Sequence, residues 1–427
     1  MTSKLKALLQ RILYPLRFLE RAVQVAEPCC GISGYRSLCA SVDVVWEPTA
    51  AYDSSKGLAY FWRQCLGRQS EKLHLGLHGD IMQLDVASLE QEPEGLIAGP
   101  PCQPWAMCGL RLQHADARCE VWEQTVEMII HFAHRGSLLF FLLENSSGMI
   151  GSRFLDETLE RLRLCMPWFA IDFVKHDLGS VWPMHRERLW IRGLRKDCLS
   201  EDDKLPEVLR DPWKIAGIQP PTLRSLLLPG KVNDTTDSMT AKQAANLRLY
   251  IQAIAAERQK HKFDLAVVEL DRCPLRAVGG RIYKDRLPSL RTQGPLLFVL
   301  STADIHLNSS QMEFHRYVLP EERLIFQGHS PDLVHHFQYK KDVLQAAGNC
   351  FNTLQASIML APLLRAAVVA GKLRRGVRQP HLSPQELSSL CFAEDRADAP
   401  STKPAAVSPK RKRQKASATI EWAMKTL

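Results

Sequence analysis

Short apolar runs alternate with amphipathic stretches from Val23 to Gly193, and this alternation constrains the fold more than any other feature of the chain. The predicted strands are Val23–Ala26, Val42–Trp46, Gly95–Ala98, Leu138–Leu143 and Leu189–Ile191. The helices predicted between them repeat apolar residues at spacings of three and four, and they are Ala51–Leu66, Val121–His134 and Phe154–Leu164. Strand–helix alternation over about 170 residues predicts an α/β fold with a doubly wound, mostly parallel sheet.

The residues that follow each predicted strand are where chemistry is expected, because ligands of such sheets bind at the carboxyl ends of the strands. Cys102 follows one strand on a proline-flanked loop, where helix N-terminal amides and nearby cations can lower a thiol pKa. Glu144 ends an all-apolar run, where carboxylates are seldom found unless they are paired or used. Arg186 and Arg188 precede the last predicted strand. A nucleophile with an acid is one interpretation, and a small buried cysteine is the alternative.

Composition excludes several classes of protein. The 427 residues include 55 basic and 46 acidic side chains, a formal net charge of +9 that permits a polyanionic partner without requiring one. The 12 cysteines form no CxxC pair, so we expect reduced thiols and no metal site. No stretch approaches the roughly 18 uncharged apolar residues of a membrane span, so we expect no membrane partner.

Five segments are predicted along the chain. Residues 1–21 are basic and predict either an amphipathic surface helix or an organelle-targeting peptide. Residues 22–193 form the α/β domain, residues 194–315 an inserted smaller domain, and residues 316–370 a return segment that completes the first domain. Residues 371–427 predict a disordered basic tail, in which Lys410–Lys415 is a candidate nuclear-import signal or phosphate-binding arm.

Seven motifs resemble, in their order and spacing, those of the cytosine-C5 DNA methyltransferases. The most specific are Gly99-Pro-Pro-Cys-Gln-Pro104, Glu144-Asn145 and Arg186-Glu-Arg188. The others are Glu27-Pro-Cys-Cys-Gly-Ile-Ser-Gly34, Gly79-Asp80-Ile81, Arg316–Glu322 with Gln327-Gly328, and Gly348-Asn349. The resemblance covers roughly residues 23–193 and 316–364 and implies a Rossmann-like methyltransferase domain with an inserted target-recognition domain.

The resemblance also implies a mechanism. Cys102 adds covalently to C6 of a cytosine flipped out of the duplex, and Glu144 protonates or hydrogen-bonds ring N3. Arg188 and Arg186 hold the base carbonyl or the loop that carries the thiol. The remaining substrate-binding candidates are Gln103, Asn145 and Gln327.

The implied methyl donor is S-adenosylmethionine. Gly31, Ile32 and Gly34 form its first loop, Trp46 stacks on the adenine, and Glu47 or Asp43 lies near the ribose. The other cofactor-binding candidates are Asp80, Ile81, Pro100 and Asn349. DNA is the expected partner, with Arg272, Arg276, Arg281, Lys284, Arg286 and Arg291 as candidate phosphate contacts. We expect a nuclear monomer, with organelle import as the lesser alternative.

Two other functions remain open. The Pro-Pro-Cys-Gln loop also fits an enzyme that methylates RNA, such as transfer RNA. Several family positions differ here, with Ser33, Met184 and Ile325 standing where glycine, glutamine and arginine are usual. These differences are the support for a catalytically impaired relative that binds nucleic acid as a scaffold.

Overall fold

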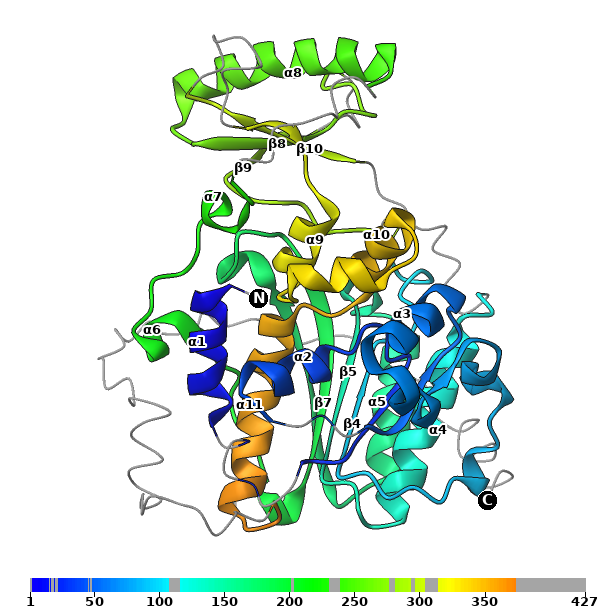
Figure 1. Ribbon diagram of the computed structural model, residues 1–427. Helices are drawn as coiled ribbons and strands as arrows, with labels where there is room; N and C mark the ends of the chain where they lie inside the picture. The colour runs from blue at the N-terminus through cyan, green and yellow to red at the C-terminus, as the bar shows by residue number, and fades with distance from the viewer. Residues whose placement is uncertain are drawn as a thin grey trace, which may run out of the picture. The chain divides into compact units, whose positions relative to one another are not determined.

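Two sheets organise the part of the chain that the computed structural model describes (Figure 1). The described residues are 2–14, 16, 19, 22–44, 46, 48–106, 116–200, 203–229, 239–275, 281–292, 296–303 and 314–373. Most of the predicted basic tail, including Lys410–Lys415, therefore lies outside them.

The first sheet has seven strands in the order β3-β2-β1-β4-β5-β7-β6. Its strands are β1 (Val25–Pro28), β2 (Pro48–Asp53), β3 (His74–Leu75), β4 (Gly95–Ala98), β5 (Phe140–Ser146), β6 (Phe169–Asp177) and β7 (Glu187–Arg195). From β3 to β5 all neighbours are parallel, whereas β7 is antiparallel to both β5 and β6. The predicted doubly wound, mostly parallel sheet is confirmed.

Helices cover both faces of this sheet, and the strand sequences reflect it. In β5, Phe140 and Leu142 belong to one buried cluster, and Phe141 and Leu143 belong to another. The first cluster includes α1 (Ser3–Ile12), α2 (Gly34–Ser41), α3 (Lys56–Leu66) and α11 (Thr353–Val369). The second includes α4 (Cys119–His134) and α5 (Arg153–Cys165). Because successive strand residues point to opposite faces, a strand buried on both sides is a continuous apolar run.

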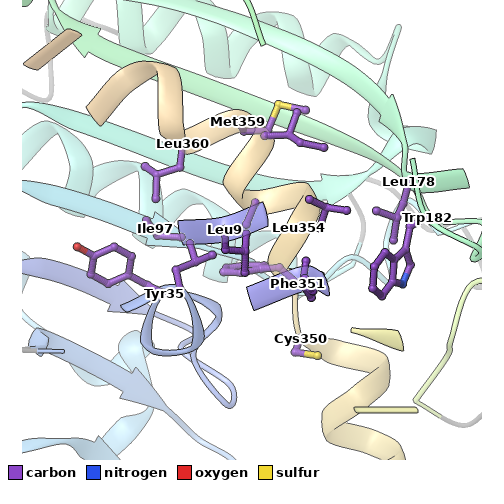
Figure 2. Packing of buried hydrophobic residues seen from close by; sticks show 14 of the residues in the cluster. Leu9, Tyr35, Ile97, Leu178, Trp182, Cys350, Phe351, Leu354, Met359 and Leu360 are labelled. Carbon is purple, nitrogen blue, oxygen red and sulfur yellow. The ribbon is translucent and has the colours of Figure 1, made fainter. Parts of the chain in front are cut away.

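The N-terminal helix α1 is part of the main core. Thr2 caps it, and Leu5, Leu8, Leu9 and Ile12 are buried. Figure 2 shows Leu9 in the same cluster as Leu354 of α11. The amphipathic helix that the sequence predicts here is confirmed: its leucine face packs into the core, and Lys4, Lys6 and Arg11 are exposed.

One predicted strand is wrong. Val42–Trp46 follows the end of α2, and Asp43 has a left-handed backbone with φ of 59° that stops an extended run. The strand lies later, at β2, and takes the first residues of the helix predicted from Ala51. That helix, α3, begins at Lys56, where the Ser55 side chain accepts a hydrogen bond from the Leu58 amide.

The second sheet is antiparallel, in the order β11-β10-β8-β9. Its strands are β8 (Leu265–Glu269), β9 (Tyr283–Lys284), β10 (Leu297–Ser301) and β11 (His315–Tyr317). Helix α8 (Ala241–Lys260) covers it, and Tyr250 and Ile254 share a buried cluster with Val268 and Phe298. Since β11 extends past residue 315, this sheet ends two residues beyond the predicted boundary.

The segments on either side of the second sheet pack with the main core. Helices α6 (Pro212–Ala216) and α7 (Leu223–Leu226) bury Trp213 and Leu223 there, as does α9 (Pro320–Phe326) with Phe326. Helix α10 (Lys340–Asn349) precedes α11. Within the described residues, the segment Lys340–Val369 is long and apolar enough to cross a membrane, but most of its apolar part is buried inside the protein, as in a core helix.

Candidate active site

A cavity of about 420 Å³ lies at the carboxyl ends of the parallel strands. Ten of the sixteen predicted site residues line it: Gly31, Asp80, Ile81, Pro100, Cys102, Gln103, Glu144, Arg186, Arg188 and Asn349. They come from the loops after β1 and β4, from β5 and β7, from the end of α10 and from the segment after β3. Residues far apart in sequence therefore share one site, as the topology of a doubly wound sheet requires.

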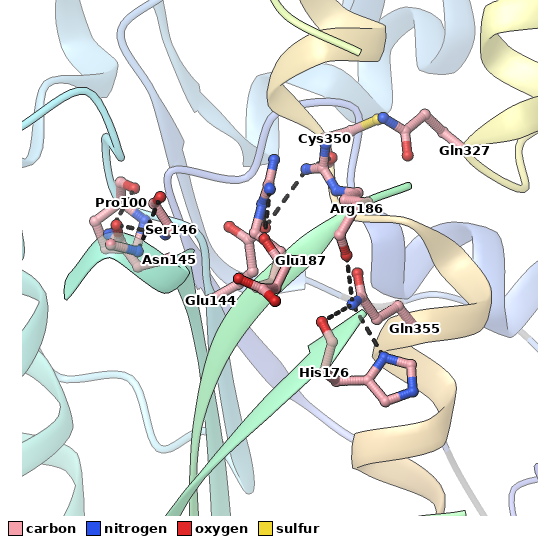
Figure 3. A network of polar contacts seen from close by, with 12 residues as sticks. Pro100, Glu144, Asn145, Ser146, His176, Arg186, Glu187, Gln327, Cys350 and Gln355 are labelled. Carbon is pink, nitrogen blue, oxygen red and sulfur yellow. Dashed lines mark hydrogen bonds and ion pairs between the residues drawn. The ribbon is translucent and has the colours of Figure 1, made fainter. Parts of the chain in front are cut away.

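One wall of the cavity carries the predicted catalytic groups. Glu144 is buried on β5, and its Oε1 lies 2.7 Å from Nε of Arg188 and 3.4 Å from Nη2 of Arg186. Arg186 also donates to the Cys350 carbonyl at 2.7 Å (Figure 3). The Glu144 carboxyl is thus held by two guanidinium groups. One of them, that of Arg186, is itself held by its hydrogen bond to Cys350, which lies between α10 and α11.

The Cys102 thiol is partly exposed and lines the same cavity. Burial raises its pKa, Arg188 opposes that rise most strongly, and Glu144 adds to it. Burial also lowers the pKa of Arg186 to about 10, with Arg188 as the second cause, so Arg186 remains charged at neutral pH. The charges around the thiol therefore favour the thiolate that a nucleophile needs, against the cost of burial.

Asn145 acts on the loop and does not line the cavity. Its side chain is buried, its Nδ2 donates to the Pro100 carbonyl at 3.4 Å, and its Oδ1 accepts from the Ser146 amide at 2.7 Å. Because Pro100 stands two residues before Cys102, this contact ties the thiol-bearing loop to β5. Asn145 was predicted to bind substrate, and the structure makes it a positioning residue instead.

The other half of the cavity suits a nucleoside-type ligand. Gly31 has a φ of 56°, and a Cβ added there would meet no atom within 4 Å, so the loop leaves open space beside it. Asp53 and Asp80 also line this half and offer carboxylate oxygens to hydroxyl, amine or cationic groups. Burial raises the pKa of Asp53, opposed by hydrogen bonds from the Ser55 and Gly31 amides. The predicted methyl donor, which carries hydroxyls, an amine and a sulfonium cation, fits these groups.

Phe351 is a core residue that packs closely against two glycines. A Cβ on Gly34 would lie 2.6 Å from its ring, and a Cβ on Gly99 would lie 2.8 Å from it. Both glycines are therefore required by close approach to one aromatic ring. Gly34 was predicted to bind cofactor, and its contact with Phe351 shows a packing role outside the cavity lining.

Three further predictions need correction. Ile32 is fully buried in the main core and does not line the cavity. Gln327 is also fully buried and donates to the Ala347 carbonyl at 2.5 Å, which links α9 to α10. Trp46 stacks on Trp62 with ring centroids 5.2 Å apart, which places it behind the cofactor loop. Glu47 lies outside the described residues.

Asp53 is a site residue that the sequence analysis missed. The reason is that the second strand was predicted at Val42–Trp46, whereas β2 is Pro48–Asp53. The acid expected at the end of that strand was therefore sought near Trp46. The signal was present as an apolar stretch, Ala50-Ala-Tyr52, that ends in Asp53 and is followed by Ser54-Ser55, a helix N-cap signature.

Several candidate phosphate contacts are already occupied. Arg272 and Arg291 both pair with the buried Glu269, at 2.9 and 3.0 Å, and Lys284 pairs with Glu257 at 2.6 Å. Arg276 lies outside the described residues. Among those that the structure describes, no group of three His, Cys, Asp or Glu side chains is arranged to hold a metal ion.

The strand order with an antiparallel β7, together with a cavity at the strand ends, defines the class of Rossmann-like methyltransferases. The same fold is found in the Entamoeba histolytica methyltransferase EhMeth, with a TM-score of 0.52 and 14% identity over 81% of this chain and 98% of that one. It is also found in a Spodoptera frugiperda DNMT2, with a TM-score of 0.53 and 16% identity over 80% and 99%. A putative DNA modification methyltransferase from an Escherichia coli prophage gives 0.51 and 15% over 81% and 100%.

Within that class, residues 24–214 match the family model of the C-5 cytosine-specific DNA methylases. The chain is 34% identical over 82 residues to the type II methyltransferase M.NgoPII of Neisseria gonorrhoeae. It is 27% identical over 128 residues to the orphan methyltransferase M.SPRI of Bacillus phage SPR. These alignments span 19% and 29% of this chain and only 23% and 28% of the two relatives.

Proposed function

We propose that this protein is an S-adenosylmethionine-dependent DNA cytosine-5 methyltransferase that acts through a covalent Cys102 adduct. The observation that carries the proposal is a single cavity shared by the Cys102 thiol, the Glu144 carboxyl and the Arg188 guanidinium. That cavity continues to Gly31 and Asp53, so a base and a methyl donor can meet in it.

Each group has a defined chemical task. Cytosine is a weak nucleophile at C5, so the Cys102 thiolate first adds at C6 and raises the electron density at C5. Glu144, fixed by the two arginines, gives a proton to ring N3 and so offsets the negative charge that develops on the ring. S-adenosylmethionine supplies a methyl group on an electrophilic sulfonium centre. C5 would take this methyl group, with S-adenosylhomocysteine as the leaving group. Loss of the C5 proton to a base, with cleavage of the bond between C6 and the Cys102 sulfur, would then free the methylated base and the thiolate.

The donors of Arg186 support a role in holding the base. Its Nε and Nη1 are buried and have no hydrogen-bond partner among the described residues, while its Nη2 is used by Cys350 and Glu144. Buried donors without partners are rare in folded proteins, and a ligand carbonyl in the cavity would satisfy them.

The substrate class and the location are further parts of the proposal. DNA is favoured by the family of residues 24–214, and the net charge of +9 suits a polyanion. RNA is the alternative substrate, because the same chemistry applies to cytosine in either polymer. The basic sequence Lys410–Lys415 supports a nuclear site of action.

The test is covalent trapping. The full chain is incubated with S-adenosylmethionine and either duplex DNA or transfer RNA that contains 5-fluorocytosine, whose fluorine blocks the final elimination. We expect a denaturant-stable adduct with DNA that is absent in Cys102→Ala and retained in Cys165→Ala, which removes a thiol outside the cavity. Bisulfite sequencing of ordinary DNA, with Cys102→Ser as the control, measures the product.

The three functions give different results in this experiment. An adduct with transfer RNA alone would transfer the proposal to RNA. No adduct with either polymer, for a chain that binds nucleic acid, would overturn catalysis and favour the impaired scaffold.

A further inference from the structure

Two tryptophans lie behind the loop that lines the cofactor half of the cavity. The rings of Trp46 and Trp62 stack with centroids 5.2 Å apart and planes 15° apart, and neither ring lines the cavity. Both indole N–H groups donate hydrogen bonds, one to the loop after β1 and one to β1 itself. Trp62 donates to the Gly31 carbonyl at 2.9 Å, and Trp46 donates to Oε1 of Glu27 at 2.8 Å.

The loop that they contact has an unusual backbone. Cys29, Gly31 and Ser33 all have left-handed φ values, of 59°, 56° and 47°. Residues other than glycine rarely adopt this conformation, and it persists only where surrounding contacts fix it. The tryptophans are therefore candidates for the contacts that fix it.

Glu27 connects the second tryptophan to the far end of the loop. Its Oε2 accepts from the Ser33 hydroxyl at 2.6 Å, and the same hydroxyl accepts from the Arg36 amide in the first turn of α2, which begins at Gly34. Ser33 stands where the family usually has glycine, so its side chain compensates locally for the strained φ. Glu27, Trp46 and Ser33 form one hydrogen-bonded chain beneath the loop.

Gly31 is fixed on both sides of its backbone. Its amide donates to Oδ2 of Asp53 at 3.0 Å, at the cavity, and its carbonyl accepts from Trp62, at the core. Movement of the Trp62 ring would therefore change the orientation of a residue whose surface lines the cavity.

We propose that Trp62, together with Trp46, is a positioning residue that sets the cofactor loop through the Gly31 carbonyl and Glu27. The proposal rests on the proposed function, since it takes this half of the cavity as the S-adenosylmethionine site. The tryptophans act without touching the cofactor. The sequence analysis predicted that Trp46 stacks on the adenine. In the structure Trp46 instead stacks on Trp62 and donates to Glu27, and it does not line the cavity.

The test removes the N–H and keeps an aromatic ring. Trp62→Phe loses the hydrogen bond to Gly31, and Trp213→Phe is the matched control, because Trp213 also donates to a backbone carbonyl, that of Val181 at 2.6 Å, away from this cavity. Calorimetric titration of the full chain with S-adenosylmethionine gives the dissociation constant. We expect about tenfold weaker binding in Trp62→Phe and an unchanged value in Trp213→Phe.

Kinetics separate positioning from a general loss of structure. At saturating S-adenosylmethionine, kcat and the KM for nucleic acid should stay within twofold of wild type in Trp62→Phe. Trp46→Phe is the second variant, should Trp62→Phe not fold, and it should weaken cofactor binding through loss of the Glu27 contact.

The outcomes are distinct. Equal dissociation constants in wild type and in the folded tryptophan variants would overturn the positioning role and leave the proposed function intact. No binding of S-adenosylmethionine by wild type would overturn the proposed function and this inference with it.

Discussion

Arg188 acts on two groups of the site at once. It pairs with Glu144 at 2.7 Å, and it is the strongest of the groups that lower the pKa of the Cys102 thiol against the effect of burial. Its charge should therefore set how much thiolate is present near neutral pH, because the thiolate and not the thiol is the reactive form.

Replacing Arg188 should shift the reactivity of Cys102 to higher pH. In Arg188→Gln the thiol pKa rises further, so alkylation of Cys102 by iodoacetamide at pH 8 should slow about tenfold for each pKa unit gained. Peptide-resolved mass spectrometry measures this rate across a pH series without any substrate. Arg161→Gln, which removes a guanidinium paired with Glu123 away from the cavity, should follow the wild-type curve. Coincident curves for Arg188→Gln and wild type would contradict the charge effect.

At the scale of single residues, the sequence predicted several residues that line the cavity, but it did not distinguish them from residues that are buried behind it. Cys102, Glu144 and Arg188 could be found because each follows or precedes a short apolar strand in a fixed order. Gln327 could not be separated from them, because a motif shows that a glutamine is present and not whether its amide contacts a ligand or the Ala347 carbonyl.

At the scale of elements, the errors come from backbone conformations that apolar patterns do not encode. Val42–Trp46 is as apolar as a strand, yet Asp43 has a left-handed φ and the chain turns there. The predicted helix that began at Ala51 lost its first turn to β2 because the strand register with β1 pairs Glu27 with Ala51. Gly95–Ala98 was predicted with its exact bounds, since so short an apolar run has the length of a strand and not of a helix.

One buried ion pair joins the two chain segments that lead into and out of the second sheet. Glu322 of α9 accepts from Arg316, at 2.5 and 2.8 Å, and from the Leu228 amide at 2.8 Å. Arg316 in turn donates to the Leu228 carbonyl at 3.0 Å. Both side chains are buried, so a loss on one side leaves an uncompensated charge.

Neutralising Glu322 should therefore be costly. Glu322→Gln is expected to lower the free energy of unfolding by about 3–5 kcal/mol, measured by chemical denaturation. Glu207→Gln, in an exposed pair with Arg210 at 3.6 Å, is the control and should have no measurable effect. Similar losses in the two variants would show that burial does not decide the strength of this pair.

At the scale of the whole molecule, the structure shows that the N-terminal helix contributes its leucines to the main core. Lysines and arginines among leucines are typical of targeting peptides, but the structure uses the leucines as core. Helix α1 packs against α2, α6 and α11, and Lys6 pairs with Asp43 at 3.1 Å. Composition could not distinguish these roles, because the same amphipathic pattern serves a membrane surface and a protein core.

If α1 is part of the core, truncation of one of its buried leucines should lower the free energy of unfolding substantially. Leu9 is fully buried, so Leu9→Ala should lower the free energy of unfolding by about 2–5 kcal/mol, whereas Lys4→Ala on the exposed face should leave it unchanged. Chemical denaturation of the full chain measures both. If Leu9→Ala were as stable as wild type, the helix would be a peripheral element, and removal of residues 1–21 after import into an organelle would again be compatible with the fold. If Leu9→Ala lowers the free energy of unfolding in the expected range, removal of residues 1–21 would expose the main core of the protein. That core includes Leu354 and also Phe351, which packs against Gly99 at the cavity.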